Sequence, residues 1–184
     1  MTVVRCWESD DPAYVAYHDE EWGRPVRDER GVLERLCLEG FQSGLSWLTI
    51  LRKRENFRSA FAGFDPESVA NFGDKDLQRL LADAGIVRHR GKIEAAIGNA
   101  RATIELREST PLEELVWEYR RDGDPPGWQA QTPESRELSK RLRTAGFRFV
   151  GPTTVYATMQ AIGVVDDHRL DCFVRANVER DRNA

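Results

Sequence analysis

The sequence contains few cysteines and no long apolar segment. Its 184 residues include three cysteines, which are far apart in the chain, so a disulfide framework is not expected and a reducing compartment fits better. No apolar run approaches the length of a membrane span, and the N-terminus lacks a basic stretch followed by an apolar one. We therefore expect a cytoplasmic protein that does not associate with membranes.

The chain also lacks an excess of positive charge. Lysine and arginine total 27 against 31 acidic residues, which gives a net charge of −4. This balance argues against loose, charge-driven binding to nucleic acid, although a local basic face is still possible. No internal repeat is present, and no strict two-residue alternation is sustained. The sequence predicts one compact all-α domain over residues 1–184, with two lobes, eight or nine helices and nothing that indicates more than a monomer.

Several local signals predict where helices begin. Asp11 precedes a proline and predicts a helix from residue 12 to about residue 22. A second helix is expected to start near Asp28, and Ser46 is expected to cap a third. The pattern Thr-Pro-Leu-Glu at residues 110–113 predicts a capping box. Residues 121–132, which include Pro125 and Pro126, are the strongest loop candidate.

Residues 37–47 place a carboxylate, an amide and an indole close together in an apolar run that glycines interrupt. On a helix, Glu39 lies at the edge of the apolar stripe that contains Leu36, so it points toward the interior. A buried carboxylate normally has a partner. Glu39 is therefore either paired with one of the many arginines or located at the floor of a ligand pocket.

A helical hairpin, in which a short turn joins two helices, is expected near residues 138–162. The first helix ends near Gly146, and Gly151 precedes a proline that starts the next helix. Glycines on both sides of a tight turn allow backbone N–H groups to converge on an anion, and the new helix adds its own N–H groups. Lys140, Arg143 and Arg148 flank this turn, so it could hold a DNA phosphate or be an ordinary helical hairpin with solvated charges.

Four residues form a possible metal-ligand set. His168 and Cys172 are four positions apart, which would place them on one face of a helix, and Cys6 and His18 lie far upstream. Two cysteines and two histidines suit tetrahedral zinc and leave no open position for water, so such a metal would be structural. The spacing equally permits a pair of buried thiols and two satisfied histidines.

Several sequence blocks, in order along nearly the whole chain, closely resemble the DNA-3-methyladenine glycosylase I family. These blocks are CW at 6–7, YVAYHDEEWG at 14–23, CLEG at 37–40, LSW at 45–47, KREN at 53–56, AGIVRHRGKI at 84–93, GFRFVG at 146–151 and DH at 167–168.

The resemblance implies a helix-hairpin-helix enzyme that hydrolyses the N-glycosidic bond of 3-methyladenine in double-stranded DNA containing alkylated purines. It implies one structural zinc ion that joins the two ends of the chain through Cys6, His18, His168 and Cys172. It also implies that the hairpin at residues 146–151 grips the DNA backbone. The residues implied to line the base pocket are Glu39, Tyr17 and Trp47, with Trp7, Trp22 and Gln42 close by.

Other interpretations are a hairpin protein that binds DNA without catalysis, and a zinc hydrolase, which would need an open metal position. No lysine occurs in the Val-Gly-Pro turn, so strand-cleaving lyase activity is not expected. Asp166 occupies the position at which the wider helix-hairpin-helix superfamily carries an aspartate. It could stabilise the developing sugar cation, but the interpretation we favour is a helix N-cap before His168.

Overall fold

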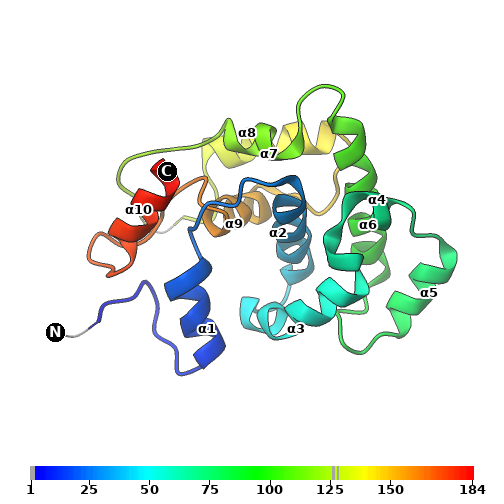
Figure 1. Ribbon diagram of the computed structural model, residues 1–184, viewed down its shortest axis with the longest axis horizontal. Coiled ribbons are helices and arrows are strands. Elements are labelled where there is room, and N and C mark those ends of the chain that lie inside the picture. Colours follow the sequence, from blue (N-terminus) through cyan, green and yellow to red (C-terminus); the bar gives the residue numbers. More distant parts are fainter. Residues whose placement is uncertain (1–2, 126, 128) are drawn as a thin grey trace.

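The chain forms a helical bundle (Figure 1), and this computed structural model describes residues 3–125, 127 and 129–184. Those residues contain ten α-helices and no strand, which confirms the all-α prediction and exceeds the predicted helix number. The helices are α1 (Pro12–Ala16), α2 (Glu29–Gln42), α3 (Trp47–Ala60), α4 (Pro66–Ala70), α5 (Asp74–Ala82), α6 (Arg90–Leu106), α7 (Leu112–Trp117), α8 (Pro133–Thr144), α9 (Pro152–Ala161) and α10 (Arg175–Asn183). None of these helices is long and apolar enough to cross a lipid bilayer.

Helix α2 lies at the centre of the molecule, beside α9 and between the α1 end and the α4–α6 end (Figure 1). Asp28 caps it by accepting a hydrogen bond from Gly31, as predicted. Its burial is wider than a single stripe, because nine of its fourteen residues are buried. A helix enclosed on most sides can carry a polar side chain inward only where a cavity or a partner receives it.

The first helical segment changes its winding halfway. Asp11 caps α1 as expected, and the chain then continues as one turn of π-helix over Tyr17–Glu21 before it ends at Gly23, whose φ is +82°. Wider turns of this kind are often found at functional sites. Here the π-turn carries both Tyr17 and His18.

The N-terminal segment and α10 lie at the same end of the molecule (Figure 1). The backbone N–H of Phe173 donates to the carbonyl of Val4 at 3.1 Å, and Arg24 forms an ion pair with Asp181. These protein contacts join the two ends of the chain.

Two local predictions were wrong. Thr110 does not cap α7, because Pro111 occupies the N-cap position and no side chain bonds to the helix start there. His168 and Cys172 do not share a helix face, because residues 166–174 are not helical and α10 begins only at Arg175. The loop predicted over residues 121–132 is non-helical where it is described, and Pro126 lies outside the described residues.

Candidate functional site

A pocket of about 220 Å³ lies where α2, α3 and α9 meet the N-terminal segment and the π-turn. All six side chains that the family resemblance implied for a base pocket line it. The complete lining is Trp7, Tyr14, Tyr17, Trp22, Glu39, Gln42, Trp47, Ala157 and Gln160.

Glu39 is the acidic group of this pocket. Glu39 is 6% exposed. It forms no ion pair or hydrogen bond within the part of the chain that the structure describes. Burial raises the pKa of Glu39 to about 8, and the positive charge of Arg35 opposes that rise only in part. The arginine-paired alternative therefore does not hold, and a carboxyl group without a partner faces the cavity.

Aromatic rings form most of the pocket wall. The ring centroids of Tyr17 and Trp47 are 5.3 Å apart, with 45° between the ring planes. Tyr14 stacks at 6.5 Å from Tyr17 and lies 5.2 Å from Trp7. The indole N–H of Trp47 is buried without a hydrogen-bond partner among the described residues. The wall therefore combines several ring faces with one unused donor and one unused carboxyl group.

A partly buried ion-pair network fixes the π-turn behind Tyr17. The carboxylate of Glu21 accepts from both terminal guanidinium nitrogens of Arg54, at 2.6 and 2.8 Å, and from Arg35 at 3.0 Å. These contacts join the π-turn to α2 and α3. A bidentate arginine is a strong and orientation-specific partner for a carboxylate, so the network holds Tyr17 in place relative to Glu39 and Trp47.

The turn between α2 and α3 has its own support. The Nζ atom of Lys92 donates to the carbonyls of Phe41 at 2.9 Å and Ser43 at 2.6 Å. Lys92 is only 8% exposed, and its charge lies against the C-terminal end of α2, where the helix dipole is negative. This contact orients the turn that connects Gln42 to Trp47.

The four candidate metal ligands come together although the chain separates them widely. The ligand atoms of Cys6, His18, His168 and Cys172 all lie within 4.8 Å of one another, and three of these residues are buried. The Nε2 atom of His168 is buried without a hydrogen-bond partner among the described residues. The Nε2 atom of His18 lies 3.6 Å from the sulfur of Cys172. Two thiols and two Nε2 atoms around one centre fit a zinc ion chemically.

Each histidine of this cluster is held by a carboxylate on its other nitrogen. Nδ1 of His18 lies 2.7 Å from Asp19, and Nδ1 of His168 lies 2.8 Å from Asp166. Asp166 also accepts the backbone N–H of His168 at 3.1 Å. Carboxylates in this position orient histidine ligands toward a metal. Asp166 therefore accepts a backbone N–H as an N-cap residue would, but no helix follows it. Its partner is His168 of the cysteine–histidine cluster.

Comparison with known proteins agrees with this geometry. Residues 7–175 match the methyladenine glycosylase family. DNA-3-methyladenine glycosylase 1 of Escherichia coli (strain K12) is 48% identical over 180 residues, which cover 92% of this chain and 96% of that protein. The chain belongs to this family.

Solved structures of the methyladenine glycosylase family superpose closely on this chain. A crystal structure of 3-methyladenine DNA glycosylase I has a TM-score of 0.87 and 45% identity, covering 92% of this chain and 98% of that one. A variant of 3-methyladenine DNA glycosylase I in complex with 3-methyladenine has a TM-score of 0.85 and 35% identity, covering 91% and 94%. The fold of the family is therefore present over nearly the whole chain.

The hairpin between α8 and α9 is built as a rigid turn. Gly146 and Phe149 both have positive φ, at +94° and +56°. The side chain of Asn99 holds both backbone groups of Arg148, accepting from its N–H at 2.8 Å and donating to its carbonyl at 3.1 Å. The backbone N–H of Gly151, at the start of α9, donates to no group of the described residues. An N–H group at a helix start without an acceptor suits an anion.

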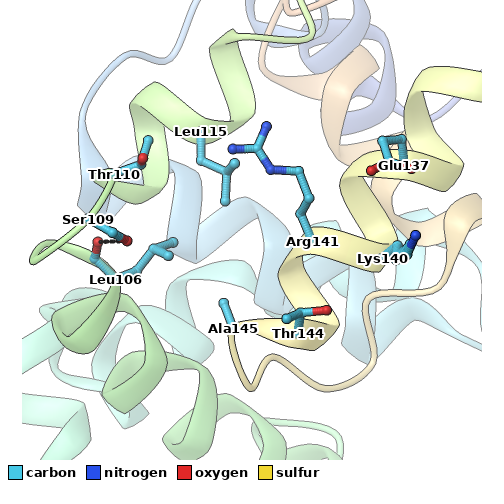
Figure 2. A pocket seen from close by; sticks show the side chains of 9 residues that line it. All are labelled: Leu106, Ser109, Thr110, Leu115, Glu137, Lys140, Arg141, Thr144 and Ala145. Atoms are coloured by element: carbon cyan, nitrogen blue, oxygen red, sulfur yellow. Dashed lines mark hydrogen bonds between the residues drawn. The ribbon is translucent and has the colours of Figure 1, made fainter.

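The basic side chains predicted around this turn are exposed. Arg148 and Arg143 both lie near it, and one nitrogen of Arg143 is within 3.6 Å of the position that a Cβ would take at Gly151. Lys140, one turn before Arg143 on α8, lines a separate hollow of about 380 Å³ between α6, α7 and α8 (Figure 2). That larger hollow contains none of the aromatic pocket residues, and its Arg141 pairs with Glu118.

The sequence did not single out every residue that completes the pocket. Tyr14 belonged to a recognised block but had no predicted role, and Gln160 was not singled out. Arg54 of the Glu21 network lies in one of the family-like blocks but had no predicted role, and Arg35 was not singled out. A hydrophobic period shows which face of a helix is buried but does not identify the partner from a distant segment. Tyr14 could have been found from its position three residues before Tyr17 on a helix, which places both on one face.

Proposed function

We propose that this protein is a DNA glycosylase that releases 3-methyladenine from alkylated double-stranded DNA and does not cleave the strand. The observation that carries this proposal is the buried, unpaired carboxyl group of Glu39 at a pocket walled by aromatic rings. Membership of the methyladenine glycosylase family supports it, since a family structure holds 3-methyladenine itself.

The positive charge of the damaged base explains why aromatic rings line the pocket. Adenine methylated at N3 carries a positive charge while it is attached to deoxyribose, and an unmodified adenine does not. Once the base leaves the duplex stack, Tyr17 and Trp47 can hold the electron-poor ring by stacking, with a cation–π contribution of about 0.5–2 kcal/mol. Glu39 complements the charge and accepts from the exocyclic amino group.

The protonation state of Glu39 allows the pocket to distinguish methylated from unmodified adenine. Burial favours its neutral form in the empty pocket, and a cationic base reverses that preference because the opposite charge stabilises the carboxylate. An unmodified adenine brings no charge and gains less from the pocket. Selection can thus depend on binding, since the bond of the cationic nucleoside is already weak.

The reaction is a hydrolysis at the sugar. The bond between C1′ and the purine nitrogen breaks, and its electron pair moves into the ring and neutralises the positive charge there. Water adds to C1′ and loses a proton to solvent, which leaves an abasic site and free 3-methyladenine. Trp7, Trp22 and Gln42 complete the enclosure of the base in this proposal.

The hairpin is the proposed contact with the DNA backbone. The turn from Gly146 to Gly151 offers the backbone N–H of Gly151 to a phosphate, and Arg148 and Arg143 supply positive charge beside it. Lys140 adds charge on the same helix as Arg143. Contacts of this kind position DNA without reading its sequence, which suits an enzyme that must find damage anywhere.

We also propose one zinc ion bound by the four residues of the cysteine–histidine cluster. The unpartnered Nε2 of His168 and the carboxylates behind both histidines support this assignment. Four protein ligands leave no place for a reactive water, so the ion is structural and the zinc hydrolase interpretation is disfavoured. Two thiols reserved for zinc also favour a reducing, cytoplasmic location.

The decisive experiment is an incubation of methylated duplex DNA with the purified protein, followed by chromatographic identification of the released purine. We expect 3-methyladenine, and loss of its release in Glu39→Gln. A protein that binds duplex DNA but releases no base would overturn the proposal in favour of the non-catalytic hairpin protein.

A further inference from the structure

Gln160 lines the aromatic pocket from α9, together with Glu39. It also borders a neighbouring hollow of about 240 Å³, so its side chain lies on the boundary between two cavities. Gln160 belongs neither to the cysteine–histidine cluster, nor to the Glu21 network, nor to the hairpin, so no role has yet been assigned to it. Like Gln42, it is nevertheless an amide side chain that could contact a base held beside Glu39.

The carboxylate of Asp167 determines which end of the Gln160 amide is available. Nε2 of Gln160 donates to Oδ2 of Asp167 at 2.8 Å. The same carboxylate accepts from the hydroxyl of Tyr156 and, at 3.1 Å, from Arg121. An ionised carboxylate can only accept hydrogen bonds, so the amide must turn its NH₂ toward Asp167. A swapped amide would place its oxygen against the carboxylate oxygen.

The amide oxygen of Gln160 therefore has a fixed chemical identity. Within the described residues this Oε1 atom forms no hydrogen bond, and it is not enclosed by protein. A carbonyl oxygen accepts and cannot donate. Beside the Glu39 carboxyl group, the pocket thus presents the Gln160 amide oxygen, an atom that can only accept.

We propose that Gln160 is a specificity-determining residue whose Oε1 accepts a hydrogen bond from the exocyclic amino group of the extruded purine, and that Asp167 is the positioning residue that fixes the amide. This inference rests on the proposed glycosylase function. An adenine amino group carries two hydrogens, one for each acceptor. A purine with an oxygen at that position would oppose the Gln160 oxygen with an acceptor of its own and would be rejected.

The test measures the affinities of two free bases, 3-methyladenine and 3-methylhypoxanthine, which differ in the amino group and the oxygen at position 6. Gln160→Leu removes the amide acceptor. We expect its affinity for 3-methyladenine to fall about tenfold, as is typical when a buried donor loses its acceptor. 3-Methylhypoxanthine, no longer opposed by the amide oxygen, should bind no more weakly than before. The matched control is Gln78→Leu, on the exposed side of α5, which should bind both bases as the unaltered protein does.

Asp167→Asn supplies a readout that a purely structural role would not move. An asparagine can donate to the oxygen of Gln160, which frees the amide to turn its NH₂ into the pocket. We expect weaker binding of 3-methyladenine together with tighter binding of 3-methylhypoxanthine. Equal losses for both bases in both variants, or no change in Gln160→Leu, would overturn the inference. If the unaltered protein neither binds nor releases 3-methyladenine, the proposed function itself fails and this inference fails with it.

Discussion

The indole ring of Trp22 meets the imidazole ring of His168 edge to face, with ring centroids 4.5 Å apart and 62° between the planes. Trp7 meets His18 in the same way, at 4.7 Å and 90°. Both indoles also line the aromatic pocket. The wall that would hold the base is therefore packed directly on the cluster that would hold zinc, and order in one depends on order in the other.

Removing the metal should therefore loosen the pocket. We expect one zinc per chain by elemental analysis, and a strong chelator or Cys172→Ser should lower the thermal midpoint of unfolding and weaken binding of 3-methyladenine. The reason is that, without the proposed ion, the histidines would no longer be fixed against the indoles.

The control for this experiment is the third cysteine. Cys37 is buried on α2, outside the cluster, so Cys37→Ser should retain its zinc. A metal-free chain with an unchanged unfolding midpoint, or equal zinc loss in the two serine variants, would contradict the assignment.

Asp166 is expected to act through His168 and not on the substrate. Asp166 is 2% exposed, and its carboxylate bonds to both the ring and the backbone N–H of that histidine. Asp166→Asn should weaken zinc affinity by about 10–100-fold, as is typical for partners of ligating histidines. With zinc in excess, release of 3-methyladenine should be close to normal. Asp74→Asn, exposed at the start of α5, is the matched control. An inactive but fully metallated Asp166→Asn would assign this residue to the chemistry.

The raised pKa of Glu39 predicts a pH dependence. Because the carboxylate form binds the cationic base and burial raises the pKa of Glu39 to about 8, kcat/KM should rise as the pH increases through about 8. Glu39→Gln should lose this dependence and at least about tenfold of the activity, since a charged hydrogen bond contributes about 1.5–3 kcal/mol.

Stability gives an independent check of the same group. Between the ordinary value of 4.5 and the folded value of about 8, the folded chain keeps a proton that the unfolded chain has lost. The stability contributed by the neutral carboxyl is therefore complete below pH 4.5 and is lost as the pH rises through 8. Relative to Glu39→Gln, the unaltered protein should become progressively less stable over this window. A constant difference would show that Glu39 ionises normally.

The elements that position this pocket could be predicted because their signals are local. Asp28 and Ser46 cap α2 and α3 through their own side chains, and capping depends on residues only a few positions apart. The helical spacing of the apolar residues then predicted that Glu39 points toward the interior. The sequence at residues 110–113 matches the capping-box pattern, but Thr110 does not cap α7, because Pro111 itself occupies the N-cap position.

The remaining features depend on contacts between distant segments. His168 and Cys172 were assigned to a helix face from their spacing, but the side chain of Asp166 takes the His168 N–H, and a turn serves the cluster equally well. The partner of Glu21 could not be chosen among many arginines. The contact between Gln160 and Asp167 joins a helix to a turn, and no periodicity describes such a pair.

Lys92 should be important for both stability and substrate binding. Lys92→Met leaves the carbonyls of Phe41 and Ser43 without their donor, which should cost about 1–3 kcal/mol in the free energy of unfolding measured with urea. The turn that carries Gln42 toward Trp47 then loses its support, so KM should rise. Lys75→Met, exposed on α5, should change stability by less than about 0.5 kcal/mol. If Lys92→Met is equally neutral, the turn is held by other contacts.

Arg148 is expected to contact a phosphate and to leave recognition of the base unchanged. Asn99 fixes its backbone, so Arg148→Ala removes the exposed side chain without releasing the hairpin. Binding to duplex DNA should weaken equally for methylated and unmethylated DNA, and the slope of log affinity against log salt should become shallower by about 1, since one fewer counterion is displaced. Lys75→Ala on α5 should leave both quantities unchanged. A loss confined to methylated DNA would instead place Arg148 in base recognition.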